Sequence, residues 1–93
     1  MAQTDIWTET ITGFTSTRTK ISDLAAPFPS EVYNAVAAIA SFGFEGENVE
    51  LLGAGVNVTG INRNVVNFDC EMKLKTSVWA EGSLTVTIIA VTA

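Results

Sequence analysis

The sequence predicts an all-β domain, and two observations carry this prediction. Apolar and polar residues alternate from Val66 to Val78, a period of two that is typical of a strand with one buried and one solvated face. Threonine, whose branched Cβ favours strands, accounts for 12 of the 93 residues. We therefore expect a fold built from sheets.

The second half of the chain contains three expected strands, at about residues 49–59, 65–79 and 84–92. Gly and Asn residues around 60–64 predict a turn after the first strand, since both tolerate positive φ. Residues 80–83, Ala-Glu-Gly-Ser, have the composition of a hairpin turn. The first strand is expected to have an apolar face formed by Leu52, Ala54, Val56 and Val58. Short turns favour pairing in chain order, as an antiparallel meander.

The first half is less regular. Seven of the threonines lie between Thr4 and Thr19, which predicts one or two strands within residues 5–25. The Ala26–Pro29 segment is expected to be a loop, because each proline lacks a donor for a sheet ladder. We expect residues 1–25 to form N-terminal strands or an arm, and residues 26–93 to form the sandwich core of a single domain.

The segment from Ser30 to Phe44 allows two interpretations. Ser30 could cap a helix, with Val32, Val36 and Ile39 at helical spacing and several alanines favouring that state. The alternative is a strand that ends at the acidic turn beginning with Glu45. A helix over residues 30–42 would give an α+β domain rather than an all-β one.

Composition excludes several classes of function. The chain has 5 Lys and Arg against 10 Asp and Glu, a formal charge of −5, which argues against binding to a nucleic-acid backbone. Histidine is absent and Cys70 is the single cysteine, so a His-based triad, a zinc site of the usual kind and an internal disulfide have no residues to form them. We expect a protein that is not an enzyme and that needs no cofactor or metal.

The N-terminal residues are polar and acidic, without the basic and apolar regions of a signal peptide. No apolar run approaches the roughly 20 residues of a membrane-spanning helix. The expectation is synthesis in a cytoplasm without membrane insertion.

Two features could form a binding site. Glu45, Glu47 and Glu50 cluster near a predicted turn, but they lack the spacing of a calcium loop, so a solvated acidic turn is expected. Trp79 falls on the polar face of its predicted strand, where it could stack on a sugar ring or fill a subunit interface. The alternative is that Trp79 folds back over the edge of the core.

From Pro27 to Ala93 the sequence resembles the H-type lectin domain and similar small bacterial and phage domains. The resemblance rests on the proline loop before Val32, the acidic turn at residues 45–49, the strand ending at Thr59, the long alternating strand with Phe68, and the Thr76–Trp79 segment. It implies a six-stranded antiparallel β-sandwich, with Glu31–Phe44 as a strand. It also implies trimers that bind sugars of the N-acetylgalactosamine type near subunit boundaries.

The same resemblance names candidate carbohydrate-binding residues. Glu50 stands where the family has an arginine, Lys73 lies at its Trp-His pair, and Trp79 takes the place of its tyrosine. These departures predict a different glycan, or none. The favoured hypothesis is a homo-oligomeric interaction module of a phage virion or similar assembly, which contacts other virion proteins or glycans. The resemblance implies that the oligomer is a trimer. A soluble lectin and an α+β binding domain are the alternatives.

Overall fold

The computed structural model describes residues 2–46, 48–76 and 79–93, and every regular element in those ranges is a strand. The six strands are β1 Gln3–Phe14, β2 Lys20–Pro27, β3 Val32–Glu45, β4 Glu50–Asn62, β5 Val65–Lys75 and β6 Glu81–Thr92. They form two three-stranded antiparallel sheets, sheet A in the order β1-β6-β3 and sheet B in the order β2-β5-β4. The predicted six-stranded antiparallel sandwich is confirmed.

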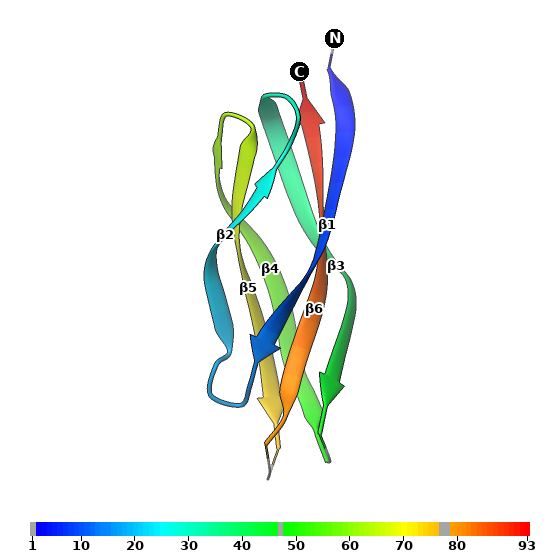
Figure 1. Ribbon diagram of the computed structural model, residues 1–93, viewed down its shortest axis with the longest axis vertical. Coiled ribbons are helices and arrows are strands. Elements are labelled where there is room, and N and C mark those ends of the chain that lie inside the picture. The colour runs from blue at the N-terminus through cyan, green and yellow to red at the C-terminus, as the bar shows by residue number, and fades with distance from the viewer. Residues whose placement is uncertain (1, 47, 77–78) are drawn as a thin grey trace.

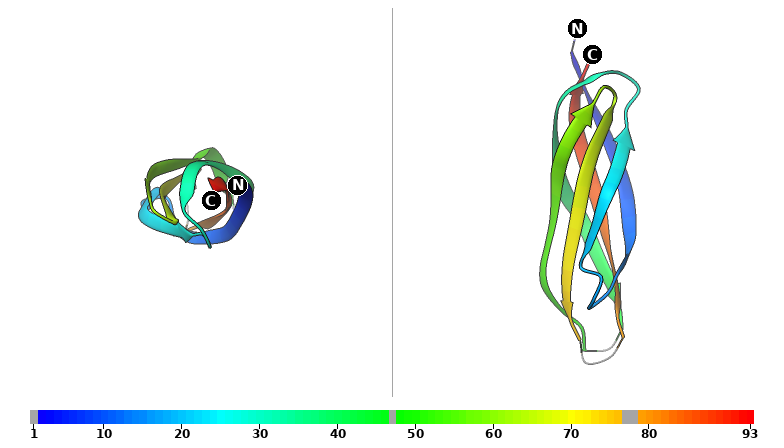
Figure 2. Two further views of the ribbon diagram at one scale, coloured as in Figure 1. Left: turned by 90° about the horizontal axis from the view of Figure 1, so that it is seen from above. Right: turned by 90° about the vertical axis from the view of Figure 1, so that its left-hand side faces the viewer.

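The sandwich is long and narrow, with principal extents of 52 × 19 × 16 Å. Figure 1 shows both termini at one end, together with the β2–β3 loop and the β4–β5 hairpin, whereas the β1–β2 loop and the ends of β3 and β5 lie toward the opposite end. We call these the terminal end and the distal end. The strands twist strongly around the long axis, so that the two sheets wrap around one core (Figure 2).

The core lies between the two central strands. In β5 the residues Val66, Phe68, Cys70, Met72 and Leu74 are buried, and in β6 Leu84, Val86, Ile88 and Ala90 oppose them. The residues of β5 that lie between these buried positions point to the outer surface of sheet B. The period of two in the sequence therefore identified the buried face of β5 correctly, while Ser77 and Val78 lie outside the described residues.

The predicted meander is wrong in its last step. β4 and β5 form the expected hairpin, but β6 pairs with β1 and β3 in the other sheet. Residues 81–83 belong to β6 rather than to a turn, and β5 ends at Lys75. The chain crosses from one sheet to the other after β5 because the buried faces of β5 and β6 are both strongly apolar and each covers the other.

The predicted apolar face of β4 also needs correction. The pairing of β4 with β5 shifts register between Leu51 and Gly53, so an extra residue is inserted there. Leu51 packs against the core, whereas the side chain of Leu52 is 59% exposed. Val56 and Val58 pack against the core as expected. A one-residue bulge shifts the alternation of the strand by one position, so residues before the bulge face the opposite side from the one that the pattern after it predicts.

The ambiguous segment is strand β3, and the helical alternative for residues 30–42 is wrong. Ala35, Ala37 and Ile39 face the core from β3, paired with residues of β6, and the residues between them face outward. Helix propensity is overridden here by pairing and packing. The part of the chain that the structure describes has no helix long and apolar enough to cross a membrane.

Within the N-terminal segment, β1 and β2 complete both sheets. β1 pairs with β6 along nearly its whole length, and β2 pairs with β5. The side chain of Trp7 in β1 packs edge-to-face against Phe68, with ring centroids 5.7 Å apart. Residue 26, the predicted start of the core, lies within β2, and Ala26 is fully buried.

Candidate interaction surface

The outer face of sheet A is the most distinctive surface of the molecule. Pairing of β1 and β3 with β6 fixes which side chains point outward, because residues opposite each other in a sheet share a face. Between Thr4 and Thr12 of β1, Asn34 and Gly43 of β3, and Ser83 and Val91 of β6, the paired outward residues are threonine, serine, small and aliphatic residues and one asparagine: Thr4, Ile6, Thr8, Thr10, Thr12, Asn34, Val36, Ala38, Ser41, Gly43, Ser83, Thr85, Thr87, Ile89 and Val91. We call this set the uncharged face.

One half of the uncharged face consists of paired threonines. The hydroxyl oxygens of Thr8 and Thr87 lie 3.1 Å apart, and those of Thr10 and Thr85 lie 2.9 Å apart. Each pair is a hydrogen bond between neighbouring strands, so the hydroxyl groups satisfy one another while their methyl groups remain available. The result is a surface of short, stiff side chains with little conformational entropy to lose on burial.

The other half, toward the terminal end, is aliphatic. Ile6 of β1, Ile89 of β6 and Val36 of β3 stand side by side across the three strands. Ile6 is 67% exposed, Val36 is 60% exposed, and Val91 is also exposed beside them. A contiguous group of exposed aliphatic side chains is a signature of an interaction site, whereas single exposed apolar residues are ordinary.

Sheet B presents the opposite character on its outer face. Its outward positions include Lys20, Glu50, Asp69, Glu71, Lys73 and Lys75. The ammonium group of Lys20 lies 3.5 Å from a carboxylate oxygen of Asp69. Both sheets have three strands and one solvent-facing side, but the outer face of sheet B is charged along its length, whereas that of sheet A bears charges only at its distal end, at Glu45 and Glu81. The comparison within one molecule shows that an uncharged outer face is not a requirement of the fold.

Sheet A lies wholly within the described residues. Going from the terminal end to the distal end, the first charged side chains on its outer face are Glu45 and Glu81, which are neighbours on adjacent strands. Burying a charge without a partner is costly. The uncharged face can therefore be covered by another molecule without that cost.

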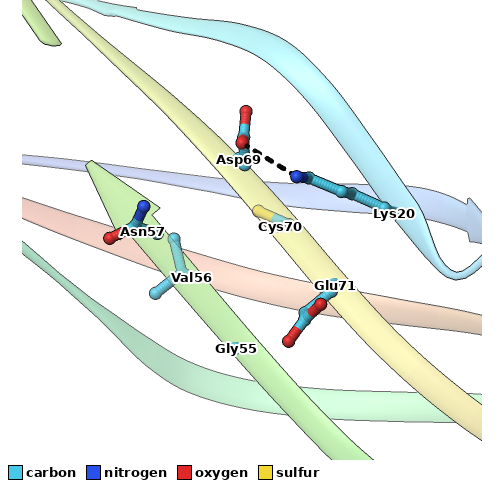
Figure 3. A pocket seen from close by; sticks show the side chains of 7 residues that line it. All are labelled: Lys20, Gly55, Val56, Asn57, Asp69, Cys70 and Glu71. Atoms are coloured by element: carbon cyan, nitrogen blue, oxygen red, sulfur yellow. Dashed lines mark ion pairs between the residues drawn. The ribbon is translucent and has the colours of Figure 1, made fainter. Parts of the chain in front are cut away.

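A second feature is a shallow depression of 270 Å³ on the outer face of sheet B. It is lined by Lys20, Gly55, Val56, Asn57, Asp69, Cys70 and Glu71 (Figure 3). The missing side chain at Gly55 leaves room for that of Glu71, whose Cγ would be 3.6 Å from a Cβ there. The lining offers hydrogen-bonding groups but no aromatic ring, so a sugar would find no stacking partner in it.

Cys70 lies at the base of this depression with its side chain directed into the core. Burial, reinforced by the nearby charge of Asp69, raises the pKa of the Cys70 thiol to about 11. A thiol with a raised pKa is a poor nucleophile at neutral pH. Among the described residues, acidic and cysteine side chains form no group of three or more that could hold a metal ion.

The three sequence-predicted site residues are only partly brought together. Glu50 and Lys73 lie on the outer face of sheet B, where Glu50 pairs with Lys75. Trp79 lies beyond β5 in the connection to β6 at the distal end, not on the polar face of the strand. Its side chain is 65% exposed, so the alternative in which it covers the core edge is wrong. The carbonyl oxygen of Trp79 lies close to Gly46, since a Cβ added at Gly46 would be 3.1 Å from it.

Sequence reasoning missed the uncharged face. The apolar run Ile88–Val91 resembles a strand covered on both sides, so the exposure of Ile89 and Val91 was not anticipated. The sequence does contain one signal of this face. Thr8, Thr10 and Thr12 alternate with Glu9 and Ile11, which indicates a strand whose one face consists of threonines. Comparisons with protein-family models, with curated proteins and with solved structures found no significant match to this chain.

Proposed function

We propose that the protein is a non-enzymatic, homo-oligomeric interaction module that buries the uncharged face of sheet A against neighbouring subunits. Within this proposal it serves as a structural or attachment component of a phage virion or a similar assembly. The observation that carries it is the contrast between the two outer faces, of which one bears charges and the other bears none from Thr4 to Thr12.

The distribution of charge is compatible with self-association through the uncharged face. Each copy carries a formal charge of −5, so two copies repel at most orientations. Contact through the uncharged face keeps carboxylates at the rim, where water and salt screen them. Self-association should therefore strengthen when the salt concentration is raised, because the residual repulsion is screened. Binding to a basic partner would weaken under the same change.

The mass of the native protein tests the proposal. Sedimentation velocity over micromolar concentrations should show an oligomer, and the lectin resemblance predicts a trimer. Ile89→Lys places a charge in the uncharged face and should shift the protein toward monomer. Asn57→Lys adds the same charge at an exposed position of sheet B and should leave the oligomer intact. A monomer at all concentrations and salt levels would contradict the proposal.

Glycan binding is the second candidate function, favoured by the exposed side chain of Trp79 and by a shallow depression at the same, distal end, whose lining does not include Trp79. That depression has a volume of 290 Å³ and is lined by Asn48, Glu50, Lys75 and Thr76. A sugar ring stacked on Trp79 could direct hydroxyl groups to such polar side chains. Screening on a glycan array, followed by titration of tryptophan fluorescence with each hit, tests this. Trp79→Ala should abolish the response, and the absence of any hit would leave only the assembly function.

A further inference from the structure

The side chains of the uncharged face are larger in its terminal half than in its distal half. Residues that pair across β1, β6 and β3 form rows on this face, which we name by their β6 residues. From the terminal end to the distal end the rows are Thr4/Val91/Asn34, Ile6/Ile89/Val36, Thr8/Thr87/Ala38, Thr10/Thr85/Ser41 and Thr12/Ser83/Gly43. The Ile89 row is aliphatic, whereas the Thr85 row, equally far from the central Thr87 row, consists of hydroxyl-bearing residues.

The distal half is also hollowed. A depression of 370 Å³ is lined by Thr12, Gly43, Phe44, Glu45, Glu81, Gly82 and Ser83. Gly43 contributes no side chain to the Ser83 row, where an added Cβ would lie 3.6 Å from the hydroxyl oxygen of Ser83. The depression in the terminal half, beside Ile89 and Val91, has a volume of only 100 Å³. The face therefore falls away from the terminal end toward a hollow at the distal end.

A face of this shape fits a second copy of itself when the two copies run in opposite directions. A two-fold axis that lies in the interface, crosses the strands and passes through the Thr87 row places each row opposite the row equally far on the other side. The Ile89 row of one copy then faces the Thr85 row of the other, and Val91 stands over the partner's hollow. Large side chains opposite small ones fill the space between two packed layers.

Packing in the same direction would place like against like. The two Ile89 rows would meet and hold the distal halves apart, so that both hollows would lose contact with the partner. It would also gather Glu45 and Glu81 of every copy at one end. These two carboxylates are already neighbours on adjacent strands, which is unfavourable by itself. Further carboxylates beside them would add repulsion.

Charges at the two ends match in the antiparallel arrangement. Arg63 lies in the β4–β5 hairpin at the terminal end, and its side chain is exposed. Its carbonyl accepts a hydrogen bond of 2.8 Å from the backbone amide of Val32, which fixes the hairpin beside the start of β3. Antiparallel packing lays β3 of one copy along β3 of the other. It therefore brings Arg63 to the distal end of the partner, which carries Glu45 and Glu81.

We propose that two copies pack antiparallel and face to face through their uncharged faces, about a two-fold axis at the Thr87 row. The inference rests on the proposed self-association and names its partner and geometry. Val91 occupies the partner's hollow, and Arg63 faces the partner's Glu45 and Glu81. The resulting unit is a dimer, in contrast to the trimer that the lectin resemblance implies.

The size of the face requires the two copies to overlap along its whole length. Three strands about 4.8 Å apart, with about 11 residues each at about 3.3 Å, give a flat projection of about 500 Å². A standard interface buries about 800 Å² of accessible surface per partner, measured over the protruding side chains. A staggered copy would cover only part of the face, whereas an axis at its central row covers all of it and adds the contacts at both ends.

Distances between spin labels test the direction of packing in the intact chain. In a Cys70→Ala background, Pro29→Cys carries a label in the β2–β3 loop at the terminal end, and Ser16→Cys carries one in the β1–β2 loop at the distal end. Antiparallel packing predicts more than about 35 Å between two Pro29 labels and between two Ser16 labels, since β3 alone spans about 40 Å. In a mixture of the two variants, the distance from a Pro29 label to a Ser16 label should be shorter than both.

The opposite order of distances would overturn the inference. In a parallel dimer or a trimer, labels at the same site lie within the width of adjacent sandwiches, each 19 × 16 Å across. The mixed pair would then be the longest of the three distances. Both labelled loops lie outside sheet A, so the labels leave the uncharged face unchanged.

Charge reversal tests the contacts at the ends. Arg63→Glu places a carboxylate against the partner's Glu45 and Glu81 and should weaken self-association about tenfold or more in sedimentation velocity. Adding Glu45→Arg to the same chain should restore most of the loss. Lys75→Glu is the matched control, because it makes the same change in net charge on the outer face of sheet B. Equal weakening by Arg63→Glu and Lys75→Glu, or the absence of rescue, would contradict the end contacts.

The inference and the proposed function fail in different ways. If Ile89→Lys dissociates a trimer, or a dimer whose same-site labels lie close together, the uncharged face is an interface and the antiparallel packing is wrong. If the oligomer survives Ile89→Lys, another surface joins the copies and both proposals are wrong. A dimer with distant same-site labels that Ile89→Lys dissociates supports both. A wild-type monomer contradicts both.

Discussion

The hydroxyl group of Thr92 donates a hydrogen bond of 2.7 Å to a carboxylate oxygen of Asp5, which links the last residue of β6 to the beginning of β1. Thr92 is fully buried, and Asp5 is half-buried beside it at the terminal end of the sandwich. Both residues lie on the core side of sheet A, where a polar group needs a partner. Because its hydroxyl group has this partner, the polar side chain of Thr92 can be buried at the terminal end of the core.

Removing the carboxylate should destabilise the fold more than a neighbouring exposed substitution. Asp5→Ala leaves the buried Thr92 hydroxyl without its acceptor, and we expect the free energy of unfolding to fall by about 1–3 kcal/mol. Thr92→Val removes the donor while keeping the shape and should cost about 1 kcal/mol. Urea unfolding measures both. Thr4→Ala, at an exposed position, is the control, and an equal effect of Asp5→Ala and Thr4→Ala would contradict the structural role.

Gly82 should not tolerate a side chain, although its sequence context resembles a turn. It is buried in β6, and an added Cβ would lie 2.6 Å from the sulfur of Met72 and 3.1 Å from a methyl group of Leu74. Relief requires the flexible Met72 side chain to shift within a packed core, so Gly82→Ala should cost about 1–3 kcal/mol. Gly53 of β4 has no atom within 4 Å of the same position. Gly53→Ala should therefore be close to neutral in the same urea experiment.

Cys70 makes stability depend on alkaline pH. The folded pKa of about 11 lies above the ordinary value of 9.0, so the unfolded chain loses the thiol proton first as pH rises. The stabilising contribution is complete below pH 9 and is lost progressively between pH 9 and 11. Two pKa units correspond to about 2–3 kcal/mol at most.

Cys70→Ala isolates this contribution. The difference in unfolding free energy between the wild type and the variant should shrink between pH 9 and 11, while other titrating groups affect both proteins equally. At pH 8 the wild-type thiol should react with a disulfide reagent only as fast as the protein opens. A constant difference between the two proteins across that pH range would show that the thiol titrates normally.

Local patterns in this sequence predicted strands well and strand partners poorly. The alternation in β5 identified its buried residues because both faces of that strand have a consistent character. The same logic misassigned Leu52, because a bulge is a single-residue event with no compositional mark. Whether β6 continues the sheet of β5 or crosses to the other sheet depends on which apolar faces cover each other, which a one-dimensional pattern does not contain.

The candidate site was harder to predict for a related reason. An exposed aliphatic residue such as Ile89 has the same local sequence signal as a buried one. The distinction arises only when three strands, separated along the chain, present their outward residues together. For Glu50, Lys73 and Trp79 the prediction came from a family resemblance, and the fold places only the first two on one sheet.

The two tryptophans should differ in their contributions to stability and in their fluorescence. Trp7 is half-buried and packs against Phe68, so Trp7→Ala loses apolar contact and an edge-to-face ring pair and should cost about 2–3 kcal/mol. Trp79 is mostly exposed in the connection at the distal end, and Trp79→Ala should change the unfolding free energy by less than about 0.5 kcal/mol. Trp7→Phe leaves an emission that iodide quenches readily, whereas Trp79→Phe leaves a shorter-wavelength emission that iodide quenches weakly. If iodide instead failed to quench Trp79 in the wild type at concentrations where the protein is oligomeric, but quenched it in the Ile89→Lys monomer, the distal end would also belong to the subunit interface.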